Sequence, residues 1–311
     1  MTTMNNFGLP ILNRLFVALF VGVGYAKYYL GRITWKSVVT ACFAVLLITS
    51  LLVFFSKPPK DGNLALNQGY ELRNNGKMIA AHDAFEKAYD IFVEQNYPRG
   101  MFVSLNALAE TDLTYNNHTE ALTHFDGALR LAKQYGDRNS QIRLFEKHAE
   151  LKLLMGRTNA ARAHYYDALK IAQDDNLNAK IASLFTKVGN LERGIGNDRK
   201  ARFAYRNALK SLETAIHKKE EAEVYLSIGT LEDELDNYQA AITSYVTART
   251  ILKQQGNIFD EATVLTQMAR LEKKLGSIDK AADYYLEAET LLASIGRTEA
   301  MRSVKSEAAS L

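Results

Sequence analysis

The sequence predicts an all-α protein: an α-solenoid of six helix-turn-helix repeats with a C-terminal cap helix, attached to one or two N-terminal transmembrane helices. Three observations predict this fold. Residues 61–300 divide into six rows of forty that align without a gap. Residues 37–56 contain no charged side chain, and the 311-residue chain has only four prolines, which interrupt helices.

The first segment, residues 1–36, is apolar and basic and contains no acid. Its apolar stretch, residues 7–26, is interrupted by Pro10 and Arg14. It could therefore be a second membrane span, a helix lying in the membrane plane, or the hydrophobic part of an uncleaved signal.

The next segment, residues 37–56, reads SVVTACFAVLLITSLLVFFS. A helix of twenty uncharged residues is long enough to cross a hydrocarbon core of about 30 Å. We expect a transmembrane helix here, in contact with membrane lipid. The two prolines of KPPKDG, residues 57–62, then predict a short, stiff linker that holds the following domain close to the membrane.

The charge distribution bears on orientation and on partners. Three bases lie in the loop before the anchor and two directly after it: Lys27, Arg32 and Lys36, then Lys57 and Lys60. The side richer in bases tends to stay inside, so we expect the repeats outside the cytoplasm or matrix. A bacterial inner membrane with the repeats in the periplasm is our first expectation, and a mitochondrial inner membrane with the repeats in the intermembrane space is the alternative. Residues 61–311 hold 32 bases and 35 acids, which does not favour a nucleic-acid partner.

Equivalent positions in the six rows hold the same kinds of residue, and helix packing explains why. Gly69 and its equivalents are all Gly or Ala, which lets two helices approach closely, and an aromatic ring fills the space opposite. Gly76 and its equivalents are Gly, Asn or Asp, which tolerate the positive φ that ends a helix. Each row therefore reads as a helix, a tight turn, a longer helix and a loop. The rows are 61–100, 101–140, 141–180, 181–220, 221–260 and 261–300, and their aromatic column is Phe85, Phe125, Tyr165, Tyr205, Tyr245 and Tyr285. We interpret these rings as packing residues.

This spacing of a small residue, a glycine turn, an alanine, an aromatic and a second alanine resembles the tetratricopeptide repeat, over 240 residues. The usual repeat is about 34 residues long. The resemblance implies a solenoid whose first helices line a concave groove for a protein or peptide partner. The lysine that such domains use to hold chaperone tails is absent from the corresponding column, which begins at Leu66, so co-chaperone function is disfavoured. Residues 301–311 overlay the start of a first helix and predict a cap helix.

The sequence predicts neither catalysis nor a cofactor. The single cysteine, Cys42, lies in the apolar segment, and the six histidines form no HExxH or similar pair of metal ligands. We therefore expect a non-enzyme without a metal.

The middle of the predicted groove is its most basic part. It could bind an acidic or carboxylate-bearing peptide, although neighbouring glutamates are close enough to pair with its cations. The predicted partner-binding residues are Arg143, Lys147, Glu150, Lys187, Asn190 and Arg193.

Two functions follow from this pattern. The first is a membrane-anchored scaffold that binds a membrane-associated protein or peptide and recruits or assembles a complex. The alternative is a constitutive structural subunit of a large membrane complex, of a secretion, respiratory or similar kind, with the solenoid packed on neighbouring subunits.

Overall fold

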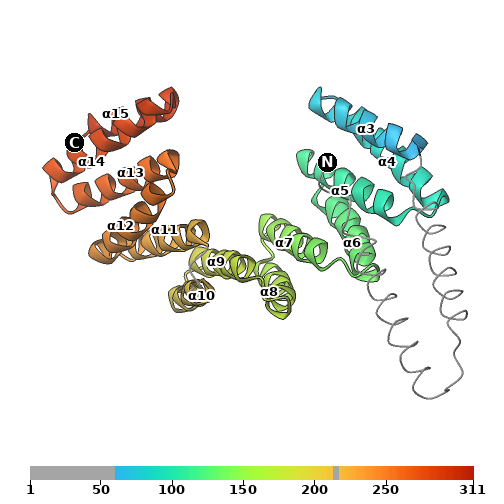
Figure 1. The fold of residues 1–311 in the computed structure, drawn as a ribbon, viewed down its shortest axis with the longest axis horizontal. Helices are drawn as coiled ribbons and strands as arrows, with labels where there is room; N and C mark the ends of the chain where they lie inside the picture. Colours follow the sequence, from blue (N-terminus) through green and yellow to red (C-terminus); the bar gives the residue numbers. More distant parts are fainter. Residues whose placement is uncertain (1–59, 213–216) are drawn as a thin grey trace, which may run out of the picture. The chain divides into compact units, whose positions relative to one another are not determined.

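The computed structural model describes residues 60–212 and 217–311, and this part of the chain contains helices and no strand (Figure 1). The predicted all-α fold class is confirmed there. The helices are α3 (Lys60–Asn74), α4 (Met78–Glu94), α5 (Pro98–Thr114), α6 (His118–Gln134), α7 (Arg138–Leu154), α8 (Thr158–Asp174), α9 (Asn178–Gly194), α10 (Asp198–Ser211), α11 (Lys218–Glu234), α12 (Tyr238–Gln254), α13 (Ile258–Lys274), α14 (Ile278–Ser294) and α15 (Thr298–Ala308).

The chain forms two compact units that meet in sequence between Met155 and Gly156. The first unit contains α3 to α7 and the second contains α8 to α15. This boundary falls inside the predicted row 141–180, whose first helix belongs to one unit and whose second helix belongs to the other. Within each unit, successive helices pair side by side, as α3 does with α4 and α11 with α12 (Figure 1).

The turns explain why the helices end where they do. A residue with positive φ recurs every twenty residues, at Gly76 and Asn96 and then through the described rows to Gly276 and Gly296. After nearly all of them the chain closes a Schellman-type bond, as from the Lys77 N–H to the Leu72 carbonyl. The expectation of a longer second helix is wrong. First and second helices are both 17 residues in most rows, because the same turn closes both.

The predicted contact between small and aromatic residues forms the core of each helix pair. All six members of the aromatic column, from Phe85 to Tyr285, are buried. A Cβ atom added to Gly69 would lie 2.4 Å from a ring carbon of Phe85, and one added to Gly229 would lie 2.5 Å from Tyr245. At Gly69 and Gly229 there is therefore no room for a Cβ atom unless the ring or the helix moves.

Each unit continues this core from one helix pair to the next. In the first unit, Phe85 and Phe92 of α4 pack in one apolar cluster with Leu66 of α3 and Leu108 of α5. In the second unit a cluster joins α13, α14 and α15, and Val304 is the buried residue of α15. The last helix begins at Thr298, three residues before the start of the predicted cap. As in the other rows, the new helix starts directly after the positive-φ turn, here at Gly296.

The predicted membrane segments, residues 1–36 and 37–56, and most of the linker at 57–62 lie outside the described residues. Among residues 60–212 and 217–311, no helix has both the length and the apolar character needed to cross a bilayer.

The contact between Gly229 and Tyr245 predicts a steric penalty for a single methyl group. Gly229→Ala should lower the free energy of unfolding by about 1–3 kcal/mol, because the ring or the helix must move to admit the new Cβ. Urea unfolding of the full chain, followed by circular dichroism, measures this change. The matched control is Gly194→Ala, since a Cβ at Gly194 meets no atom within 4 Å. The control should be neutral or stabilising, and equal losses in the two variants would contradict the packing account.

Candidate functional site

The six predicted groove residues lie on first helices of two different units. Arg143, Lys147 and Glu150 belong to α7, and Lys187, Asn190 and Arg193 belong to α9. The structure therefore brings together the three residues of each helix. That all six share one groove stays a prediction.

On α7 the cations are only weakly engaged. Lys147 and Glu150 form an ion pair of 3.6 Å in which both side chains are about half exposed. Solvent-exposed pairs of this kind contribute about 0–1 kcal/mol. The Arg143 guanidinium donates to the Ser140 hydroxyl at 2.7 Å, and this neutral acceptor leaves its charge uncompensated. This surface can therefore present positive charge to a partner.

On α9 the polar side chains are held by other helices. The Tyr205 hydroxyl of α10 donates to the Asn190 side-chain carbonyl at 2.7 Å. This bond leaves the two amide hydrogens of Asn190 directed away from α10 as donors. Burial raises the pKa of the Tyr205 hydroxyl, so the tyrosine stays a neutral donor at ordinary pH. Asn190 is thus an exposed donor in a fixed position.

Arg193, one of the predicted cations, forms an ion pair with Glu234 at the end of α11. The same kind of pair recurs within both units, where a base on one first helix meets an acid on a neighbouring first helix. The pairs are Arg73 with Glu110 at 2.7 Å, Lys274 with Asp233 at 2.5 Å and Arg270 with Glu307 at 2.7 Å. Much of the positive charge of this face is therefore neutralised within the protein.

A second kind of ion pair joins a second helix to the following first helix at two described junctions, α8–α9 and α10–α11. Arg202 of α10 makes two hydrogen bonds, of 2.9 and 2.8 Å, to Glu232 of α11. One repeat earlier, Arg162 of α8 donates one hydrogen bond, from Nε, to Glu192 of α9, again thirty residues further along the sequence. Each ion pair connects two neighbouring repeats.

The ion pair with Arg162 also affects the pKa of the Glu192 carboxyl. Burial raises its pKa, but the hydrogen bonds from Asn197 and Arg162 outweigh burial and bring the pKa below the ordinary value of 4.5. The carboxylate is therefore the form that the folded state stabilises.

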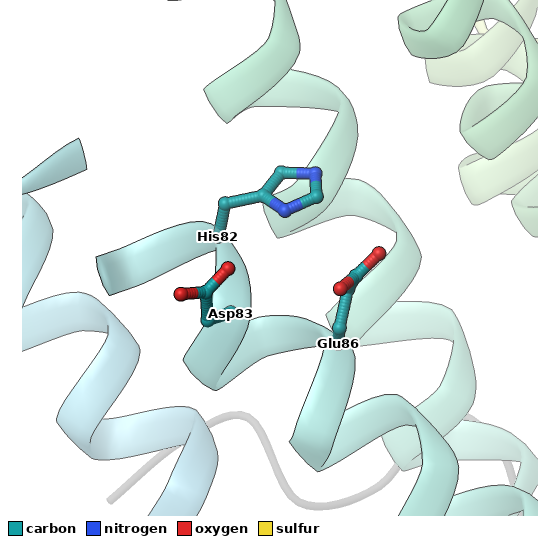
Figure 2. Close-up of side chains that lie close together, drawn as sticks. All are labelled: His82, Asp83 and Glu86. Atoms are coloured by element: carbon teal, nitrogen blue, oxygen red, sulfur yellow. The ribbon is translucent and has the colours of Figure 1, made fainter. Parts of the chain in front are cut away.

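A group of possible metal ligands on α4 was missed at the level of sequence. His82, Asp83 and Glu86 each offer one ligand atom, and these atoms lie within 4.8 Å of one another (Figure 2). The histidine is half-buried and the two acids are exposed. They do not form a pair of histidines at metal-ligand spacing. The available signal was a His and a Glu four residues apart, which lie on the same side of a helix.

A hollow of about 160 Å³ lies between α13 and α15, beside the Arg270–Glu307 pair. Its wall includes the apolar side chains of Phe259, Leu292 and Val304. Because its charged pair is already neutralised internally, the hollow suits an uncharged side chain better than a charged one.

The family model described as Tetratricopeptide repeat matches residues 100–174, about a quarter of the chain. These residues carry tetratricopeptide repeats. The match covers α5 to α8 and includes the α7 half of the predicted groove. No curated protein matches the chain in sequence.

Solved structures with a similar fold support a tetratricopeptide-repeat protein. BtubC (BKLC) from P. vanneervenii is 18% identical with a TM-score of 0.56, and the match covers 76% of this chain and 93% of that one. The apo form of RapI is 13% identical with a TM-score of 0.55, covering 80% of this chain and 96% of that one. A signal transduction ATPase with numerous domains from Pyrococcus horikoshii, which has a tetratricopeptide repeat sensor, is 14% identical with a TM-score of 0.54, covering 78% of this chain and 40% of that one. At these identities the likeness concerns the fold alone.

The lowered pKa of Glu192 predicts a loss of stability in acid. A carboxyl with a depressed folded pKa stabilises the fold above its ordinary value of 4.5, and this contribution disappears as the pH falls through the folded value. The free energy of unfolding of Glu192→Gln should therefore fall less steeply below pH 4.5 than that of the unaltered chain, in urea titrations at a series of pH values. Asp283→Asn, at an exposed position of the same unit, is the control and should keep the original slope. A Glu192→Gln profile parallel to the original would contradict the assignment.

Proposed function

We propose that this protein is a membrane-anchored tetratricopeptide-repeat scaffold that binds a protein or peptide partner on the face of its first helices. The repeat fold is suited to protein–protein interaction. We place the centre of binding on α7 and α9, at Arg143, Lys147, Glu150, Lys187, Asn190 and Arg193. The partner would have an acidic or carboxylate-bearing segment.

The observation that carries this proposal is the fixed position of polar groups on the first helices. Tyr205 holds the side-chain carbonyl of Asn190, and Glu234 holds Arg193. Side chains whose conformations are already restricted lose less entropy when a partner binds. Arg143 and Lys147 add exposed positive charge on α7. Together these groups suit an extended peptide with backbone carbonyls and at least one carboxylate.

The anchor is proposed from the uncharged run of residues 37–56. The stiff linker, residues 57–62, would keep the first helices near the membrane surface. A partner in the same membrane then meets the repeats at high effective concentration, so a contact of modest affinity is sufficient. We therefore propose a membrane-associated partner.

We propose further that the repeats face away from the cytoplasm or matrix. The greater number of bases before the anchor than after it supports this orientation. The bacterial inner membrane with the repeats in the periplasm is the preferred location, and the mitochondrial inner membrane with the repeats in the intermembrane space is the alternative.

One observation favours the second candidate function, a constitutive subunit of a larger membrane complex. In the second unit, large apolar side chains are exposed on successive second helices: Tyr166, Phe203, Val246 and Leu286. Exposed apolar side chains on one kind of helix are typical of a surface that another protein covers. A permanent neighbour could pack there while the first helices remain available.

Charge reversal tests the proposed binding face. The double variant Lys147→Glu and Lys187→Glu should abolish recovery of the partner when the tagged full chain is purified from native membranes and analysed by mass spectrometry. Reversal replaces attraction for an acidic segment by repulsion. Helicity and thermal unfolding should not change, because substitutions at solvent-accessible positions are tolerated.

The matched control is Lys170→Glu with Lys210→Glu, two exposed lysines on the second helices α8 and α10. This variant should recover the same partners as the unaltered chain. If both double variants lose the partner, or neither does, binding uses a different face.

Removal of residues 1–60 tests the anchor. The full chain should stay in the membrane fraction during extraction with alkaline carbonate, whereas the shortened chain should be released. Protease added to the extracytoplasmic side should digest the repeats of the full chain. Complete resistance until the inner membrane is broken would reverse the proposed orientation.

A further inference from the structure

The first described junction between repeats has a histidine at the position where the α8–α9 and α10–α11 junctions have an arginine. Arg162 and Arg202 reach Glu192 and Glu232, thirty residues further along the chain. His82 of α4 occupies the equivalent position and faces Asp112 of α5, again thirty residues further. A guanidinium is always charged, but an imidazole carries a charge only when it is protonated. At this position the α4–α5 junction therefore lacks the permanent cation that Arg162 and Arg202 supply at theirs.

Two more carboxylates converge on the same histidine. Asp83 and Glu86 come within 4.8 Å of each other and of a ring nitrogen of His82. Figure 2 shows both acids on the same side of the imidazole, along one turn of α4. Within residues 60–212 and 217–311, neither acid has a hydrogen-bond or ion-pair partner. Two negative charges and an imidazole nitrogen thus face one point without a cation from the described part of the chain.

A buried carboxylate lies behind the imidazole. The Asp112 side chain is 4% exposed, and its Oδ1 atom is 3.6 Å from His82 Nε2. Its other oxygen, Oδ2, is 2.8 Å from Nδ1 of His124 on α6, which holds the carboxylate in place. Because Asp112 lies beside Nε2, the ring nitrogen that remains as a ligand atom is Nδ1. Histidines that bind metals in proteins are oriented by a carboxylate in the same way.

We propose that His82, Asp83 and Glu86 bind a divalent transition-metal ion of the zinc class, with water completing the coordination. One imidazole nitrogen with two carboxylate oxygens suits Zn²⁺, whereas Ca²⁺ and Mg²⁺ prefer oxygen ligands alone. Asp112 is a positioning residue, because it orients His82 without contacting the ion. The ion would supply the positive charge that Arg162 and Arg202 supply at the α8–α9 and α10–α11 junctions.

The proposed site would also connect two repeats. Its ligands belong to α4, while the carboxylate behind the histidine belongs to α5 and is held from α6. A metal that binds only the folded protein stabilises it in proportion to the logarithm of its concentration. Zn²⁺ should therefore raise the melting temperature of the unaltered chain.

Calorimetric titration of the full chain with ZnCl₂ tests the proposal. We expect saturable binding of one ion per chain that is lost in His82→Ala and in Glu86→Gln. Because the Glu86 side chain is exposed, Glu86→Gln should leave helicity unchanged and keep the test independent of folding. Binding should weaken between about pH 7.5 and about pH 5.5, because protons compete for the ligands.

The matched control is Glu94→Gln, at an exposed acid two turns further along α4, which should bind Zn²⁺ as the unaltered chain does. Asp112→Asn should weaken binding by about 10–100-fold if Asp112 orients the ligand. Equal Zn²⁺ binding in the unaltered chain and in Glu86→Gln would overturn the proposal. Binding of Ca²⁺ as tight as that of Zn²⁺ would also overturn it, since it would indicate an unspecific acidic surface.

Discussion

Every described helix pair depends on a close contact between a ring on the second helix and a small residue on the first. At Gly189 an added Cβ would lie 2.4 Å from Tyr205, and the same contact recurs at Gly69 and Gly229. This contact sets the distance between the two helices and therefore the position of every side chain on the first helix. The polar face on which we propose binding is a consequence of that distance. The hydroxyl of Tyr205 extends the same contact to the surface, where it holds Asn190.

Two kinds of ion pair join neighbouring repeats. One series of ion pairs joins neighbouring first helices, as between Arg193 and Glu234, and lies on the face proposed for binding. The other joins a second helix to the next first helix, as between Arg202 and Glu232, and clamps the junction. Net charge alone does not describe such a surface, because most of its cations already have acidic partners.

The α4–α5 junction shows how a histidine in place of the arginine at residues 162 and 202 gives the same position a different chemistry. An arginine at this position closes the junction with a charge that does not titrate. With histidine at residue 82, the same geometry leaves a nitrogen lone pair among carboxylates, which is a favourable arrangement for a metal ion. The scaffold and the proposed metal site are therefore compatible, since the site lies on α4 and the proposed binding residues lie on α7 and α9. A structural ion there would stabilise the unit that contributes α7.

The sequence by itself determined the helical class, the turn positions and the aromatic column, because each depends on local backbone preference or on a spacing that recurs every forty residues. It did not predict equal helix lengths, although the turn residues recur every twenty. The tertiary structure decided which side chains meet. Glu234 lies 41 residues from Arg193 and Asp112 lies thirty from His82, and a pattern in sequence does not specify which of several acids a base will reach. That choice depends on the stagger and spacing of packed helices, which arise only when the rings of Phe85, Tyr205 and their equivalents are buried.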